Sequence, residues 1–223
     1  EILKDFCEVD IKTGLNEDEL VNIIGVYDAL LVRSGTDVTK RIIDAGDKLK
    51  FIGRAGTGVD NIDLDAATKK GIMVANAPSG NTLAACEHTL AMITSLARNI
   101  PQANASMRRG EWNRSDFMGV ELNEKVLGIV GFGRIGQELA KRAIGLEMKV
   151  LAYDPYINEE RAEQLGCEVV SIDDLFRRAD FITVHTPLIK ETKHLINEKS
   201  IKTMKDGVRI INCARGGIID EAA

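Results

Sequence analysis

Short runs of apolar residues alternate with stretches of helical pattern along most of this chain. Such alternation predicts β-α-β units, in which helices join parallel strands, and therefore an α/β fold. Strands are predicted over residues 29–33, 51–53, 72–75, 126–130, 149–153, 168–170, 181–184 and 208–212. Helices are predicted over residues 16–24, 38–45, 63–70, 82–97, 101–109, 135–144, 159–165, 172–178 and 198–204.

A break in this alternation divides the chain. The long helix predicted over residues 82–97 is rich in small side chains, and Pro101 either ends it or starts the next helix. The segment 110–119 then leads to a second series of strands and carries the only Trp. We therefore predict two domains of doubly wound parallel sheet, residues 1–99 and residues 100–223.

The most informative local motif is a glycine-rich turn that joins a predicted strand directly to a predicted helix. Gly131 permits the tight turn, Gly133 lets the backbone approach a pyrophosphate, and Gly136 lets helix and strand pack closely. The free N–H groups and the dipole of the helix start hold the phosphate charge. The next strand ends in Asp154, close to the spacing of about 20 residues at which an acid meets a ribose hydroxyl. Together these features predict an NAD site, because the carboxylate would repel the 2′-phosphate of NADP.

Composition narrows the class of protein. Hydrophobic residues make up 44% and charged residues 28% of the chain, and the net charge of −5 argues against nonspecific binding to nucleic acid or to an anionic membrane. No apolar run approaches the roughly 20 residues that span a bilayer. The four cysteines lie far apart without a C-x-x-C pair, so we expect no disulfide framework or zinc site, and a cytoplasmic protein. No set of metal ligands is visible.

Residues that follow predicted strands are the candidates for chemistry, because ligands of open α/β sheets bind beyond the carboxyl ends of the strands. A cleft between the strand ends of the two domains is the expected active site. Oxidation of a 2-hydroxy acid needs a cation for the carboxylate and an acid/base for the hydroxyl proton. Arg215, which follows the last strand, fits the cation. Of the three histidines, His185 at a strand end is the best placed acid/base.

Five motifs stand out together: Arg-Ala-Gly-Thr-Gly-Val-Asp-Asn at 54–61, Gly-Phe-Gly-Arg-Ile-Gly at 131–136, Tyr-Asp-Pro at 153–155, His-Thr-Pro at 185–187 and Asn-Cys-Ala-Arg-Gly-Gly-Ile-Ile-Asp-Glu at 212–221. Together they resemble one family, the D-isomer-specific 2-hydroxyacid dehydrogenases. The resemblance covers essentially the whole chain, and it implies a flavodoxin-like substrate-binding lobe over residues 1–99. It further implies a Rossmann NAD-binding lobe over residues 100–223 that is incomplete at its C-terminus.

Within that family, the chain is most similar to members that oxidise 3-phospho-D-glycerate to 3-phosphohydroxypyruvate with NAD, the first step of L-serine biosynthesis. The resemblance implies that Arg215 is the catalytic arginine and that Arg54 and Asn81 help to hold the substrate. His185 matches a motif position that is not the acid/base of the family, which weakens the interpretation made from residues alone. A homodimer or a larger homo-oligomer is also implied.

The resemblance also implies which residues contact each part of the cofactor. Arg134 and Ile135 are expected at the pyrophosphate, within the turn of Gly131, Gly133 and Gly136, and Asp154 at the adenosine ribose. The residues implied on the nicotinamide side are Thr57, Thr186, Cys213, Ala214 and Arg215.

The chain departs from the family pattern at its ends. The catalytic Glu and His of the family follow the motif that ends at Glu221, whereas the sequence ends at Ala223. We therefore expect these 223 residues alone to have little or no turnover. Other interpretations remain open: another 2-hydroxyacid dehydrogenase, such as a glyoxylate/hydroxypyruvate reductase or a D-lactate-type enzyme, a non-catalytic NAD(H)-sensing protein, or a structural fragment without activity.

Overall fold

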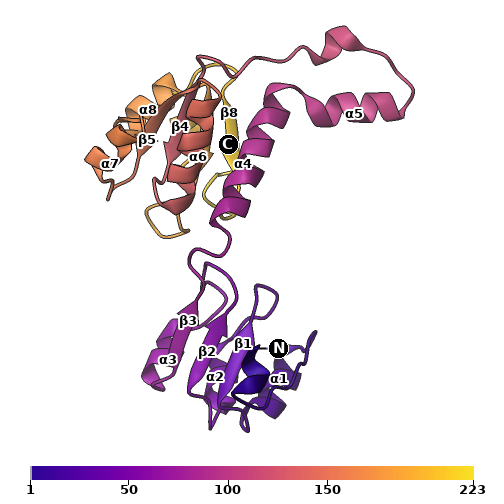
Figure 1. The fold of residues 1–223 in the computed structure, drawn as a ribbon, viewed down its shortest axis with the longest axis vertical. Helices are drawn as coiled ribbons and strands as arrows, with labels where there is room; N and C mark the ends of the chain where they lie inside the picture. Colours follow the sequence, from indigo (N-terminus) through magenta and orange to yellow (C-terminus); the bar gives the residue numbers. More distant parts are fainter. Residues whose placement is uncertain (1) are drawn as a thin grey trace. The chain divides into compact units, whose positions relative to one another are not determined.

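Two compact units make up residues 2–223, the part of the chain described by the computed structural model. The first unit ends at Asn81 and the second unit begins at Thr82, and each unit contains its own parallel sheet (Figure 1). The predicted α/β fold with parallel sheets is confirmed.

The first unit is built on a three-stranded parallel sheet in the order β1-β2-β3. Its α-helices begin where the side chains of Asn16, Thr39 and Asp63 accept hydrogen bonds from first-turn N–H groups. One face of the sheet buries Ile52 in a core shared with the helices, which contribute Ile24 and Ile43. The elements are η1 (Ile2–Asp5), α1 (Glu17–Ile24), β1 (Ala29–Val32), α2 (Lys40–Ala45), β2 (Phe51–Arg54), α3 (Leu64–Lys69) and β3 (Met73–Asn76).

The second unit contains a five-stranded parallel sheet in the order β6-β5-β4-β7-β8. The chain runs outward from β4 to β6, then returns to the other side of β4 with β7 and β8. Such a reversal makes the sheet doubly wound and leaves a crevice at the carboxyl ends of β4 and β7, where ligands of this architecture bind. The strands are β4 (Val126–Val130), β5 (Lys149–Tyr153), β6 (Glu168–Val169), β7 (Phe181–Val184) and β8 (Arg209–Asn212).

Helices cover both faces of this five-stranded sheet. On one face, Leu127 and Ile129 of β4 pack in a core with α4 and α6, and on the other face Val130 packs with Leu175 of α8. Alternate residues of a strand point to opposite faces, which explains why β4 is apolar throughout. The helices are α4 (Thr82–Ala97), α5 (Ile100–Arg108), α6 (Arg134–Gly145), α7 (Glu159–Gln164), α8 (Ile172–Arg178), α9 (Glu198–Ile201) and the 3-10 turn η2 (Arg114–Phe117).

The compact units divide between Asn81 and Thr82, earlier than the boundary predicted between residues 99 and 100. Helix α4 packs against α6 and β8 and buries Cys86 and Ile93 in the core of the second unit. Pro101, which suggested the boundary, lies in the first turn of α5. Proline is well tolerated in a first turn, so it marks a helix start here and not a change of domain.

Most predicted elements appear within one or two residues of their expected bounds. Helix α9 is shorter than predicted and ends at Ile201, because the N–H groups of Thr203 and Met204 bond to carbonyls three residues back, in a tighter turn. No helix in residues 2–223 has the length and apolar character needed to cross a membrane.

Candidate functional site

Four adjacent strands of the second unit end in line. Pairing places Val130 of β4 beside Tyr153 of β5 and Val184 of β7, and Val184 beside Asn212 of β8. The residues one step further along are therefore neighbours at one edge of the sheet. They are Gly131, Asp154, His185 and Cys213, and each opens a segment for which the sequence predicted a role at the cofactor site.

The start of α6 is open to a ligand. Gly133 is the N-cap, and no side chain of the described residues caps the helix. The first-turn N–H groups, including those of Arg134 and Ile135, therefore lack the side-chain acceptor that most helix starts have. A Cβ built on Gly133 would meet no atom within 4 Å, so the space before the turn is clear. The amide groups and the helix dipole suit a diphosphate, and the residues present fit the pyrophosphate of a dinucleotide.

The other two glycines of the turn have no room for a side chain. Gly131 has a φ of 95°, and a Cβ there would lie 2.7 Å from the carbonyl oxygen of His185. A Cβ on Gly136 would lie 2.4 Å from the carbonyl oxygen of Gly131. The turn therefore packs against both the helix that follows it and the segment after β7.

Asp154 joins two loops at this edge of the sheet. One carboxylate oxygen accepts the N–H of Phe132 at 2.9 Å, and the other accepts the N–H of Tyr156 at 2.9 Å. Two carboxylate oxygens offer about four acceptor positions, so capacity remains for ribose hydroxyls. The sequence predicted the ribose contact of Asp154 but not its bonds to the backbone.

The segment after β7 lies directly against the glycine turn. The methyl group of Thr186 would lie 3.1 Å from a Cβ on Gly131, and its hydroxyl oxygen is buried with no partner among the described residues. Buried polar atoms normally have a partner, so this hydroxyl is available to a ligand.

His185 is a poor candidate for the acid/base. Burial lowers the pKa of His185 to about 4, so the ring is neutral at physiological pH. One ring nitrogen lies 3.1 Å from the hydroxyl oxygen of the fully buried Thr183. His194 is half-exposed, with its ring 3.9 Å from Asp220.

The loop after β8 carries Arg215 and is shaped by Asn212. The Asn212 side chain accepts the N–H of Ala214 at 2.9 Å and donates to the carbonyl of Arg215 at 2.8 Å. The Arg215 guanidinium donates to the carbonyl of Ala214 at 2.9 Å and is exposed. Cys213 and Ala214 are half-buried, each packed against a core on one face of the sheet.

The residues of the first unit that were predicted to bind ligands lie at the corresponding edge of its sheet. Asn76, at the end of β3, donates to the carbonyl of Thr57, and the Thr57 hydroxyl donates to the side-chain oxygen of Asn81. Arg54, at the end of β2, donates from one terminal nitrogen to the carbonyl of Gly58. Its Nε is buried with no partner among residues 2–223, which is the state expected of an anion-binding guanidinium.

A further cation lies at this edge and was missed from the sequence. Arg33 follows β1, and pairing aligns the end of β1 with Arg54 and Asn76. Its side chain is exposed, while its carbonyl accepts from the amide of Asn61. The predicted strand 29–33 included Arg33, whereas β1 ends at Val32. A basic residue just past a strand is the signal that picked out Arg215.

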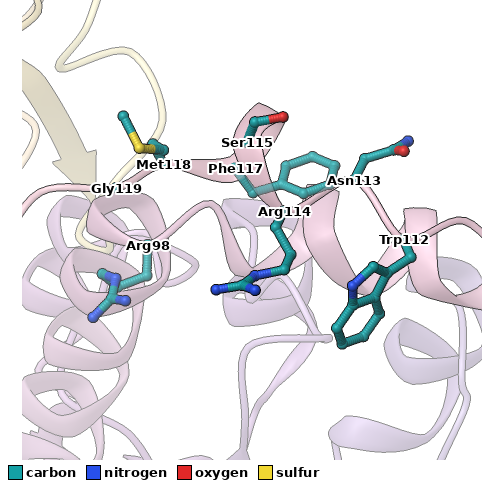
Figure 2. Close-up of a pocket in the computed structure, with 8 residues that line it drawn as sticks. All are labelled: Arg98, Trp112, Asn113, Arg114, Ser115, Phe117, Met118 and Gly119. Carbon is teal, nitrogen blue, oxygen red and sulfur yellow. The ribbon is translucent and has the colours of Figure 1, made fainter.

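A cavity of about 760 Å³ lies elsewhere in the second unit and shares no lining residue with the glycine turn. It is formed by the end of α4 and the segment around η2. Figure 2 shows the side chains of Arg98, Arg114 and Trp112 extending to the same side of that segment. Trp112 and Met118, which both line the cavity, are 73% and 82% exposed.

Comparison with known proteins identifies the family. Residues 90–223 match the model of the D-isomer specific 2-hydroxyacid dehydrogenase NAD binding domain. The chain belongs to the D-isomer specific 2-hydroxyacid dehydrogenase family. This confirms the resemblance drawn from the motifs and identifies NAD as the cofactor of the second unit.

Curated relatives of the family match the whole chain. D-3-phosphoglycerate dehydrogenase of Synechocystis sp. is 55% identical over all of this chain and 40% of its own length. The enzyme of the same name from Bacillus subtilis is 54% identical over all of this chain and 42% of its own length. The chain thus spans about two fifths of the length of these relatives.

A solved structure of the family has the same fold. D-lactate dehydrogenase from Aquifex aeolicus, complexed with NAD and lactic acid, is 36% identical and superimposes with a TM-score of 0.82. The match covers 90% of this chain and 60% of that one.

Proposed function

We propose that the protein to which this chain belongs oxidises 3-phospho-D-glycerate to 3-phosphohydroxypyruvate by transfer of a hydride to NAD, the first step of L-serine biosynthesis. The observation that carries the proposal is the common edge of β5, β4, β7 and β8, where an open helix start follows β4 and the loop of Arg215 follows β8. The names of the relatives that match the whole chain support phosphoglycerate as the substrate.

In this proposal the second unit holds the cofactor. The turn of Gly131, Gly133 and Gly136, with Arg134 and Ile135, binds the pyrophosphate. Asp154 binds the adenosine ribose. NAD, when bound, accepts the hydride. The nicotinamide side of the second unit is lined by Thr186, Cys213, Ala214 and Arg215.

Arginines hold the negatively charged substrate. Arg215 binds the carboxylate and keeps the reacting carbon in place, because a guanidinium can donate two parallel hydrogen bonds to a carboxylate. Arg54 and Asn81 hold the remainder of the substrate, and Arg33 adds a second positive charge to the same edge of the first unit. The unpartnered Nε of Arg54 supports an anionic ligand there.

The test uses the protein at the full length of its curated relatives. NADH formation is followed by absorbance with 3-phospho-D-glycerate, D-glycerate and D-lactate as substrates. We expect phosphoglycerate to be preferred, and Arg215→Lys to lower kcat/KM by about 100-fold, because lysine keeps the charge but loses the paired hydrogen bonds. Equal or faster turnover of glycerate or lactate would overturn the substrate assignment. NADH binding without turnover of any of them would favour a sensing role.

We also propose that the protein forms a homodimer or a larger homo-oligomer through the arm, defined as residues 100–119. The arm extends away from the five-stranded sheet within the second unit (Figure 1). Several large exposed apolar side chains within one segment favour a role in a protein interface. The large apolar side chains that the arm exposes are Ile100, Met107, Trp112 and Met118.

Sedimentation analysis tests this interface. Met118→Glu is expected to shift the protein to monomers. Val26→Glu places the same charge at an exposed apolar position of the first unit and should leave the oligomer intact. A Met118→Glu protein that sediments like the unmodified protein would exclude the arm as the interface.

A cytoplasmic location is part of the same proposal. All four cysteines are free, and burial raises the pKa of Cys167 to about 11. Free cysteines are typical of proteins from reducing compartments. Fractionation of cells that produce the protein tests the location directly.

A further inference from the structure

We propose that Asp154 is a positioning residue for the glycine turn, in addition to the ribose contact assigned above: it holds the turn in its phosphate-binding shape before the cofactor arrives. The inference rests on the proposed cofactor role of the turn. It concerns a property of the ligand-free protein and is therefore open to separate measurement.

The geometry ties two loops through one carboxylate. The turn between β4 and α6 donates the N–H of Phe132, and the turn between β5 and α7 donates the N–H of Tyr156. One step earlier, the N–H of Gly131 donates to the carbonyl of Tyr153 at 2.8 Å. The bond from Phe132 thus extends the pairing of β4 with β5 into the turn itself.

The Phe132 peptide is held at both ends. Its side chain is 5% exposed, and its N–H precedes the helix, so no helical carbonyl is available to it. On the other side, the Phe132 carbonyl accepts from the side-chain amide of Gln137 at 3.1 Å. Asp154 therefore holds the peptide group that joins Gly131 to Phe132, and Gln137 holds the one that joins Phe132 to Gly133.

A carboxylate performs this task better than its amide. Both partners of Asp154 are N–H donors, and both carboxylate oxygens are acceptors. Asparagine has one acceptor oxygen, and its NH₂ group would face an N–H. Hydrogen bonds to a charged acceptor are also stronger than neutral ones. An acid at this position therefore serves the backbone even where no ribose is bound.

This dual role makes a prediction about cofactor preference. If Asp154 acted only on the ribose, its removal would relieve repulsion of the 2′-phosphate and let NADPH bind well. Because its removal also frees the turn, we expect Asp154→Ala to bind NADPH no more tightly than the unmodified chain binds NADH. Any gain from lost repulsion is offset by the loss of a preformed phosphate site.

The experiment compares Asp154→Ala, Asp154→Asn and Gln137→Ala with Glu163→Ala, an exposed acid of α7 that serves as the control. Hydrogen exchange of peptides covering residues 130–136 is measured without ligand. We expect exchange to be fastest in Asp154→Ala, intermediate in Asp154→Asn and Gln137→Ala, and unchanged in the control. Circular dichroism confirms folding of each variant, and Asp154→Asn and Gln137→Ala keep the test valid if Asp154→Ala does not fold.

Calorimetry with inorganic pyrophosphate then separates the two roles, since pyrophosphate has no ribose. We expect Asp154→Ala and Gln137→Ala each to weaken pyrophosphate binding by about fivefold or more, the loss typical of one removed hydrogen bond. Unchanged exchange and unchanged pyrophosphate affinity in Asp154→Ala would overturn the positioning role. If the unmodified chain failed to bind NADH or pyrophosphate, the proposed cofactor site would be wrong, while the exchange result would still decide whether Asp154 holds the turn.

Discussion

The carboxyl-end edges of the two sheets differ in what they present to the anionic ligands proposed for them. In the second unit, the edge is formed mainly by the main chain. It comprises a helix start without a side-chain cap among residues 2–223 and closely packed glycines. Polar side chains such as Asp154 and Asn212 bond to this main chain. In the first unit, the edge presents a long basic side chain, Arg54, folded over its own loop with a buried nitrogen unpartnered among residues 2–223.

The difference concerns how binding is coupled to folding. A site made of backbone is part of the packing, so a change that disturbs the ligand site also disturbs the unit. A site made of exposed side chains contributes little to the packing of its unit, so these side chains can be replaced with little effect on stability. At the closely packed positions of the second unit, binding and stability should therefore be lost together, whereas at the side chains of the first unit they should be lost separately.

The largest expected effect is at Gly136. Its Cβ would lie 2.4 Å from the carbonyl oxygen of Gly131. We expect Gly136→Ala to weaken NADH binding by about 100-fold and to lower the free energy of unfolding by about 1–3 kcal/mol, the usual cost of overpacking. Calorimetric titration and urea denaturation measure the two effects.

Two other glycines of the same segment provide matched controls. A Cβ at Gly133 or Gly145 would meet nothing within 4 Å. Gly133→Ala should cost only about 0.5 kcal/mol, as a poorer N-cap, but should block the pyrophosphate. Gly145→Ala should leave NADH binding unchanged. If all three variants bound NADH equally, the backbone site would lie elsewhere.

The next largest effect is the response of the second unit to acid. The pKa of His185 is about 4 in the folded unit and 6.5 in the unfolded chain, so the unfolded chain binds the extra proton first. Stability associated with this group is present above pH 6.5 and falls as the pH decreases towards 4. We expect a loss on the order of 2–3 kcal/mol by pH 4.5.

Urea denaturation between pH 7.5 and pH 4.5 checks this effect. His185→Asn should show a smaller decrease over that range, while His194→Asn, which changes an exposed ring, should follow the unmodified chain. Identical pH dependence in His185→Asn and the unmodified chain would contradict the assignment of the acid response to His185.

A smaller effect is expected at Lys70 in the first unit. Its ammonium group donates to the carbonyls of Ile43, Asp44 and Gly46 at 2.6, 2.8 and 3.0 Å, at the end of α2. Positive charge is favourable at a helix C-terminus, so Lys70→Met should destabilise the first unit by about 1 kcal/mol. Hydrogen exchange of peptides from α2 measures this, with Lys69→Met as the control. Equal exchange in the two variants would mean that the three contacts add nothing.

The smallest expected change in stability is at Arg54, the side chain of the first unit that is proposed to bind the substrate. Arg54→Met removes a buried nitrogen that lacks a partner among residues 2–223, along with one bond to Gly58. The two contributions oppose each other, so we expect the free energy of unfolding to change by less than about 1 kcal/mol. In the full-length protein, the KM for 3-phospho-D-glycerate should nevertheless rise. A large loss of stability would remove the distinction between the two edges.

The sequence allowed the prediction of features that depend on neighbouring residues. The glycine turn and the strands that end before Asp154 and His185 follow from local turn chemistry and from apolar runs. Features that depend on packing between distant segments were missed. Helix α4 belongs to the second unit because it packs against β8, near the other end of the chain, and no local pattern around Pro101 records that contact. Likewise, the partners of Asp154 became visible only once β4 and β5 were paired.

The distribution of cysteines and of the single tryptophan makes the chain suited to distance measurement by fluorescence. Cys7 is exposed and belongs to the first unit. Cys86 and Cys167 are buried, and burial raises the pKa of both thiols, which slows their reaction with a dye. A Cys213→Ala background would leave Cys7 as the accessible thiol, and Trp112 of the second unit would serve as the donor for a dye attached there. Energy transfer between the two would then report any hinge motion of the units when NADH is added.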